Sequence, residues 1–332
     1  MIGKHRVVVY NSKLRYDFTV KRKFTILRGS SATGKTCLCN MLMRTSTVKE
    51  CDVQLFVLPS SNWEVILRNI SNQIIFVDEG FPYMVSHEFA TAMFNSDNYF
   101  VLITREKLSS VPYSVNEIYG LTESKTEASV NKSYTTNVFY NLYNDIEFSS
   151  RFKPDLLLIE DSNSEYTFFN LVKKGSIDCK AASGKSKIYQ ALLTNLKDYN
   201  NICLIVDGAA FGSEIDEIIS FFNSRLNKNI ILETPESFEF LLFNAIRDVF
   251  GVNIDWLSKT YNYCSRDFLL SNNFITKDDS ETLPSWERFY TKLLIGITKS
   301  DTKFRYSKLS FNRNYLEFAK EVLRQLPDIS IT

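Results

Sequence analysis

The chain has too few histidines for the commonest metal and hydrolase chemistry. It contains only His5 and His87 among its 332 residues, so a histidine-based metal site or a Ser-His-Asp triad is nearly excluded. Its six cysteines are scattered, and no second Cys or His pair stands at zinc-site spacing from Cys37 and Cys39. We therefore interpret the cysteines as reduced thiols of a cytoplasmic protein.

Long apolar runs and a strong net charge are also missing. No apolar segment approaches the ~20 residues needed to cross a bilayer, and the start of the chain has no signal-peptide core. The formal net charge is +1, so no global field points to an acidic partner, although a local basic patch is compatible with it. We expect a globular protein without a membrane span, located in the cytoplasm.

The sequence does contain two successive alternations of short apolar runs with stretches of helical spacing. The first predicts a small antiparallel edge at 6–10 and 16–20. It also predicts strands at 24–27, 53–58, 73–78, 99–104 and 118–121 and helices at 37–44, 63–70 and 87–95. The second predicts strands at 155–159, 176–181, 202–206 and 229–233 and helices at 164–173, 186–196 and 213–223. This alternation predicts an α/β fold with parallel sheets covered on both faces. From residue 236 onward the pattern is mainly helical.

A glycine-rich loop lies between the strand at 24–27 and the helix at 37–44. It fits G-x-x-x-x-G-K-[ST] at every fixed position, and its residues are Gly29, Ser30, Ser31, Ala32, Thr33, Gly34, Lys35 and Thr36, followed by Cys37. Such a loop turns backbone N–H groups toward phosphate oxygens, and the following helix adds its positive end. We predict that it binds ATP with Mg²⁺, with Lys35 on the β- and γ-phosphates and Thr36 on the metal.

Two acids follow the strand at 73–78. Asp78 is placed to hold Mg²⁺ beside Thr36, and Glu79 is suited to orient and deprotonate a water that attacks the γ-phosphate. This is the pattern of a Walker B segment. Two acids after a strand are also found at the start of ordinary solvated loops, but the glycine loop favours the functional interpretation.

The strand at 99–104 ends in Thr104 and Arg105, and there the first block resembles the additional-strand group of P-loop ATPases. In that group a strand inserted between the loop strand and the Walker B strand ends in a polar sensor. The resemblance implies that Thr104 or Arg105 contacts the γ-phosphate or the attacking water. Solvation of a strand end explains the two residues equally well.

The second alternation resembles the Toprim fold of primases, topoisomerases and OLD-family nucleases. The resemblance implies that Glu160, after the first strand, and Asp207, after the third, bind catalytic Mg²⁺. The usual D-x-D motif is incomplete, because Ala209 occupies its second acid. Two-metal chemistry needs several carboxylates, so we interpret this half as degenerate, with Glu214 or Asp216 as replacements if it is active.

The whole chain resembles bacterial and mobile-element proteins that join a short P-loop ATPase to a Toprim-like domain, as OLD-type phage-defence proteins do. This predicts a P-loop NTPase domain at 1–125, a connection at 126–152, a Toprim-like domain at 153–235 and a helical C-terminal segment at 236–332. Aromatic residues at 285–290 and Tyr306 suit the core of a helical subdomain better than a surface for single-stranded nucleic acid.

Three functions are compatible with these motifs. The first is an ATPase whose nucleotide state controls assembly or partner binding, in phage defence or mobile-element biology, with an inert Toprim-like half. The second is an ATP-regulated, metal-dependent nuclease acting through Glu160 and Asp207. The third is a nucleotide-gated adaptor that does not hydrolyse ATP. We expect a homo-oligomer that binds ATP and a nucleic-acid or protein partner.

Overall fold

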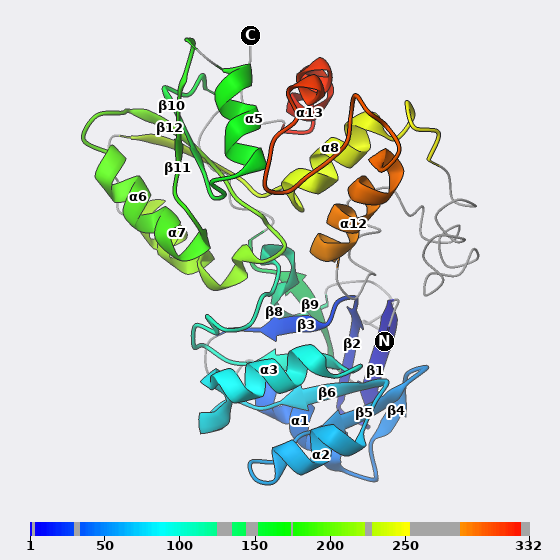
Figure 1. Cartoon of the computed structure of the whole chain (residues 1–332). Coiled ribbons are helices and arrows are strands. Elements are labelled where there is room, and N and C mark those ends of the chain that lie inside the picture. The colour runs from blue at the N-terminus through cyan, green and yellow to red at the C-terminus, as the bar shows by residue number, and fades with distance from the viewer. Residues whose placement is uncertain are drawn as a thin grey trace. The chain divides into compact units, whose positions relative to one another are not determined.

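The computed structural model describes residues 1, 4–29, 34–124, 135–143, 152–173, 175–222, 228–252 and 286–326. These residues form two compact units, the first ending at residue 143 and the second beginning at residue 152 (Figure 1). Within this described part, no helix is long and apolar enough to cross a membrane.

The first unit is built on a nine-stranded sheet. Its strands are β1 (His5–Tyr10), β2 (Leu14–Val20), β3 (Phe24–Leu27), β4 (Val48–Glu50), β5 (Gln54–Val57), β6 (Gln73–Val77), β7 (Tyr99–Ile103), β8 (Ile118–Glu123) and β9 (Thr135–Asn141), in the order β4-β1-β2-β9-β8-β3-β7-β6-β5. The strands β5, β6, β7, β3 and β8 run parallel, as predicted. The strands β1 and β2 form an antiparallel pair, as predicted for 6–10 and 16–20. The sheet as a whole is mixed, because β1 also joins β4 and β8 joins β9 in antiparallel pairs that were not predicted.

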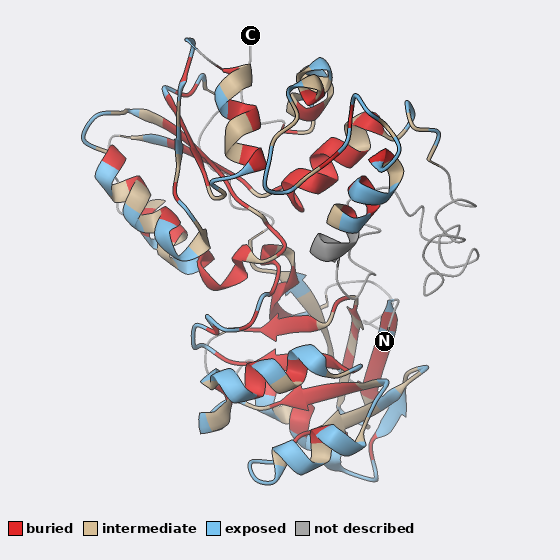
Figure 2. Ribbon diagram, viewed as in Figure 1, coloured by how far each residue is buried: buried red, intermediate tan, exposed pale blue. Residues whose placement is uncertain are grey.

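The inner strands of this sheet are buried over almost their whole length. Every residue of β3 and β7 is buried, and so are four of the five residues of β6. A strand covered on both faces reads as a continuous apolar run, which explains why the sequence predicts these strands well. The helices α1 (Lys35–Met43), α2 (Trp63–Asn69) and α3 (His87–Asn95) bury one side and expose the other (Figure 2).

The order of the inner strands places three strand ends side by side. The strand β7 pairs with β3 on one side and with β6 on the other, all in parallel. It is therefore inserted between the strand that precedes the glycine loop and the strand that precedes Asp78. Since parallel strands end at one edge of a sheet, the residues that follow β3, β6 and β7 are neighbours.

The segment predicted to connect the two halves contributes a strand to the first unit. The strand β9 lies inside 126–152 and fills the place between β2 and β8. It packs on the core through Phe139, whose ring stacks on that of Phe18 with centroids 4.0 Å apart. Its sequence, Thr-Thr-Asn-Val-Phe-Tyr-Asn, carries its larger apolar residues in one short run between polar residues, without alternation, which is a weak strand signal.

The second unit contains a four-stranded, wholly parallel sheet. Its strands are β10 (Leu156–Ile159), β11 (Asp178–Ala181), β12 (Asn201–Ile205) and β13 (Asn229–Glu233), in the order β11-β10-β12-β13. The helices between them are α5 (Ser164–Val172), α6 (Ile188–Asn195) and α7 (Ile215–Phe222). Each element predicted from the second alternation is present, within two residues at either end.

The helical C-terminal segment belongs to the second unit. It contains α8 (Phe238–Ile246), α12 (Trp286–Thr298) and α13 (Ala319–Leu323). Tyr290 is fully buried, with its ring 5.1 Å from that of Phe240, and Tyr306 is 5% exposed. The core interpretation is confirmed for Tyr290 and Tyr306, whereas residue 285 and the side chains of 286–289 lie outside the described residues.

Candidate functional site

Two glycines of the predicted phosphate loop have backbone angles that favour glycine. Gly29 has a φ of 139° and Gly34 a φ of 92°. A side chain at such angles is strained, so the local backbone accounts for both glycines. Residues 30–33, which complete the predicted loop, lie outside the described residues.

Lys35 begins α1 and is turned back toward the loop. Its ammonium group donates a hydrogen bond of 2.9 Å to the carbonyl oxygen of Gly29, and only 4% of the residue is exposed. Burial lowers the pKa of Lys35, while the charges of Glu79 and Asp78 raise it and that of Arg105 lowers it. The charge of Lys35 therefore interacts with those of Asp78 and Glu79, the two acids that follow β6.

Asp78 lies directly beside the start of α1. Its carboxylate accepts a hydrogen bond of 2.9 Å from the N–H of Glu79. Burial raises the pKa of Asp78, which this hydrogen bond, the charge of Lys35 and the nearby Thr36 hydroxyl oppose. The structure thus brings Thr36 and Asp78 together, as the metal prediction requires.

The two sensor candidates after β7 differ in where they lie. Thr104 is buried, and its hydroxyl accepts a hydrogen bond of 2.9 Å from the N–H of Glu106. Arg105 is half exposed, and its Nε lies 3.6 Å from Oε2 of Glu79. Arg105 is therefore the residue of the pair that contacts the predicted catalytic base, while the Thr104 hydroxyl caps a turn of its own backbone.

Tyr16, on β2, contacts the predicted phosphate loop. This fully buried side chain donates a hydrogen bond of 2.9 Å to the carbonyl oxygen of Gly34. It also hydrogen-bonds Cys37, which packs against the core of the first unit. The predicted role of Cys37 next to the nucleotide stays a prediction, since the described contact of its thiol is with Tyr16.

Gly34→Ala is expected to destabilise the chain more than Gly80→Ala. Both glycines have a φ above 90°, but a Cβ at Gly34 would stand 3.0 Å from the Tyr16 hydroxyl, whereas nothing lies within 4 Å at Gly80. The backbone cost is about 1–2 kcal/mol at either position, and overpacking adds to it at Gly34. Denaturant melts of both variants measure the difference, and equal losses would show that Tyr16 yields freely.

In the second unit, Glu160 and Asp207 are neighbours at the carboxyl ends of β10 and β12. The backbone N–H of Asp207 donates a hydrogen bond of 3.1 Å to Oε2 of Glu160. The N–H of Glu160 in turn bonds the carbonyl oxygen of Ile205, at the end of β12. The prediction that these two acids lie close together is confirmed, while their binding of a metal stays a prediction.

An acidic pocket of about 100 Å³ opens beside these two residues. Its charged lining residues are Glu160, Asp161, Glu165, Asp207, Glu239 and Lys308. Glu165 is 2% exposed, and no described residue forms a hydrogen bond with its Oε1 atom. Burial raises the pKa of Glu165 well above its usual range, and the charge of Asp207 raises it further.

Glu165 and Glu239 received no individual role in the sequence-based prediction. Each stands in the first turn of a helix, α5 and α8 respectively, where acids commonly interact with the helix dipole from a solvated position. One signal was present, because Glu239 lies between Phe238 and Phe240 in an apolar run. Its Oε1 accepts a hydrogen bond of 2.8 Å from the buried Tyr306 hydroxyl.

The two replacement acids considered from sequence lie elsewhere. Glu214 is buried, and its Oε1 accepts a hydrogen bond of 3.1 Å from the Ser213 hydroxyl. Asp216 is exposed on α7. Neither is among the described residues that line the acidic pocket, so the prediction that they supply its missing acid has no support in this geometry.

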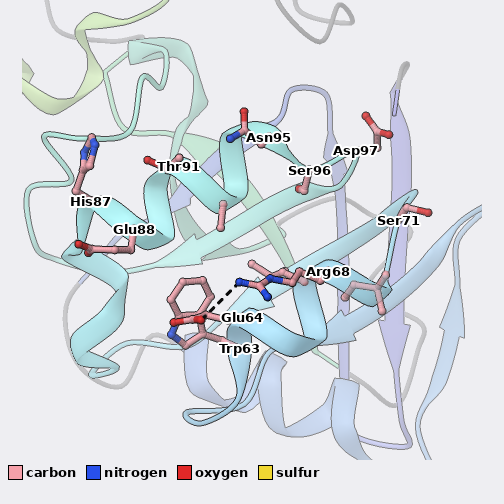
Figure 3. Close-up of a pocket in the computed structure, with 13 residues that line it drawn as sticks. Trp63, Glu64, Arg68, Ser71, His87, Glu88, Thr91, Asn95, Ser96 and Asp97 are labelled. Atoms are coloured by element: carbon pink, nitrogen blue, oxygen red, sulfur yellow. Dashed lines mark ion pairs between the residues drawn. The ribbon is translucent and has the colours of Figure 1, made fainter.

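A separate, open cavity of about 860 Å³ lies between α2 and α3 (Figure 3). It is lined by Trp63, Glu64 and Arg68 of α2 and by His87 and Thr91 of α3. Glu64 and Arg68 form an exposed ion pair of 4.0 Å, which contributes little stability. No predicted site residue is among those that line this cavity.

Comparison with known proteins adds no identification. No family model matches the sequence, no curated protein matches it, and no solved structure matches the fold. The resemblance to ATPase–Toprim proteins therefore stays a prediction from the sequence motifs.

Proposed function

We propose that the first unit binds ATP with Mg²⁺ and hydrolyses it. The observation that carries the proposal is the meeting of Lys35, Asp78 and Glu79 at the carboxyl ends of β3 and β6, next to two glycines with positive φ. A buried lysine at a helix start suits phosphate oxygens, and a carboxylate close to a threonine hydroxyl suits a magnesium ion.

The strand order supports the additional-strand type of P-loop ATPase. In that type the strand with the polar sensor separates the loop strand from the Walker B strand, and β7 occupies this position. The ends of these strands form the edge at which open α/β sheets collect ligands. The antiparallel strands β1, β2 and β4 extend the sheet beyond β9 and leave the order of the parallel strands intact.

The proposed chemistry assigns one role to each charged residue. Lys35 neutralises the β- and γ-phosphates, and Thr36 and Asp78 hold the magnesium ion. Glu79 orients and deprotonates the attacking water. Arg105 forms an ion pair with Glu79 at this site. When a nucleotide binds, the γ-phosphate is a stronger hydrogen-bond acceptor for the Arg105 guanidinium than Glu79 is.

Asp78→Asn tests the metal position of this proposal. We expect Mg²⁺-dependent ATP hydrolysis to fall by about tenfold to a hundredfold, the range typical when a group that supports a bound metal is lost. Hydrolysis is measured as phosphate release over a Mg²⁺ titration. Asp97→Asn, an exposed acid of the same unit, is the matched control, and parental activity in Asp78→Asn would refute the assignment.

The nucleotide state is proposed to control assembly or the binding of a partner, with the second unit as the responding part.

A second candidate function, metal-dependent cleavage of nucleic acid, is favoured by the acidic pocket beside Glu160 and Asp207. Incubation of the purified chain with plasmid DNA and Mn²⁺ distinguishes the nuclease function from the control function. Nicking that Asp207→Asn abolishes would establish the nuclease, whereas intact plasmid leaves the ATP-dependent control function.

A further inference from the structure

The chain between α12 and α13 (Figure 1) supplies one side of the acidic pocket. Lys308 lies in this stretch, and it is the single basic residue among the described residues that line the pocket. Residues 306–311, all of which the structure describes, form neither helix nor strand. These six residues are called the strap below.

Two buried side chains of the pocket hold the first half of the strap. The hydroxyl of Ser164, at the start of α5, lies 3.1 Å from the carbonyl oxygen of Ser307 and 2.8 Å from that of Lys308. The Tyr306 hydroxyl donates a hydrogen bond of 2.8 Å to Oε1 of Glu239, on α8. Ser164 and Glu239 both line the pocket and are 3% and 4% exposed. The strap is therefore fastened by the pocket itself.

Aromatic rings hold the other end of the strap. The ring of Phe311 lies 5.8 Å from that of Phe168 on α5, which lies 5.4 Å from that of Phe238 on α8. Between the two anchored ends Lys308 is exposed and Leu309 is 85% exposed. The middle of the strap thus has few buried contacts, which is typical of segments that open locally while the rest of a fold stays intact.

The pocket is small while the strap is fastened. Its volume is about 100 Å³, which holds several waters, whereas pockets that bind small molecules usually measure roughly 300–1,000 Å³. The Oε1 atom of Glu165, a lining residue that is 2% exposed, has no hydrogen-bond partner among the described residues. A buried polar atom without a partner destabilises a fold, and a polar group that entered a wider pocket would supply one.

We propose that the strap is a gate of the acidic pocket. Fastened, it limits the pocket to water. Released from Ser164 and Glu239, it widens the pocket, so that an organic ligand with N–H or O–H donors reaches Glu165. The gate lies within the second unit and does not depend on the nucleotide site.

Hydrogen exchange of the full chain tests whether the strap opens without unfolding. The N–H of Tyr306 donates a hydrogen bond of 2.9 Å to the Thr298 hydroxyl, whereas that of Cys203 lies in the inner strand β12. We expect the Tyr306 amide to exchange at least about tenfold faster than the Cys203 amide, at a rate that low denaturant leaves unchanged, because local opening exposes little surface. Equal rates that rise together with denaturant would show that the strap opens only when the whole unit unfolds, and would refute the gate.

Carbodiimide labelling of carboxyl groups, located by mass spectrometry, tests whether the strap controls entry. In the parent, Glu165 is expected to react at least about tenfold more slowly than the exposed Asp216. Ser164→Ala and Tyr306→Phe each remove one anchor, and each is expected to speed the labelling of Glu165 by about tenfold while that of Asp216 stays unchanged. Thr194→Ala, which removes an exposed hydroxyl of α6 outside the pocket, is the matched control and is expected to label as the parent does.

Two labelling results would overturn the gate. Labelling of Glu165 in the parent as fast as that of Asp216 would show that the pocket is already open. Parental labelling of Glu165 in both Ser164→Ala and Tyr306→Phe would show that the strap does not control entry. Parental exchange of the Cys203 amide in each variant shows that the fold is intact, and the exchange measurement on the parent chain decides the proposal without any variant.

Discussion

Lys35→Ala is expected to weaken the binding of Mg·ATP by about a hundredfold, because the lysine supplies charge-assisted hydrogen bonds to two phosphate groups. The side chain is already directed at the loop, where its ammonium group bonds the Gly29 carbonyl oxygen. Alanine removes the donor and also the positive charge that interacts with Asp78 and Glu79, so these two carboxylates would repel a triphosphate. Titration with a fluorescent ATP analogue in Mg²⁺ measures the loss.

The chain contains its own control for this substitution. Gly184-Lys185-Ser186 in the second unit repeats the Gly-Lys-hydroxyl pattern of residues 34–36. The Lys185 ammonium group donates instead to the carbonyl oxygen of Ala210, at 3.2 Å, within the second unit. Lys185→Ala is expected to bind the analogue as the parent does, and equal affinity in Lys35→Ala and the parent would refute the nucleotide site.

The inner strands of both sheets can be predicted from the sequence, because strands covered on both faces consist of consecutive apolar residues. Residues 99–104 predicted a strand, and β7 spans Tyr99–Ile103. The partners of the outer strands were harder to predict, since pairing depends on residues distant in the sequence. The strand β9 pairs with β2, from which it is separated by more than a hundred residues of sequence. It was not predicted within the connection because its short apolar run lacks the alternation of a strand.

The residues of the candidate sites were likewise only partly predictable from the sequence. Strand-end residues such as Asp78 and Asp207 follow from the strand pattern, because parallel strands end at a common edge. Contacts made by long side chains do not follow. The sequence named Thr104 or Arg105 as the sensor without deciding between them, and it did not predict the ion pair of Arg105 with Glu79. Glu165 and Glu239 reach their pocket from helices, so only the packing of α5 against α8 reveals them.

Glu79→Gln is expected to retain ATP binding and to reduce turnover by about two orders of magnitude or more. A general base acts on the transition state and contributes little to ground-state affinity. Glutamine keeps the size of the side chain and a hydrogen-bonding oxygen, so the water can still be held, but it has no carboxylate to accept the proton. The loss of the ion pair with Arg105 affects stability little, because both side chains are partly exposed. Single-turnover phosphate release, measured beside analogue binding, separates the two effects.

Glu88→Gln, which changes an exposed acid of α3, is the matched control and is expected to turn over at the parental rate.

Arg105→Ala tests the role of the arginine beside Glu79. If the arginine only restrains Glu79, its removal raises turnover or leaves it unchanged, whereas a contact with the γ-phosphate makes turnover fall in Arg105→Ala as well. Parental turnover in Glu79→Gln would show that Glu79 is only a solvated acid after β6, without a catalytic role. A parent chain that binds ATP without hydrolysing it would instead establish the nucleotide-gated adaptor, with Glu79 held by Arg105 away from any attacking water.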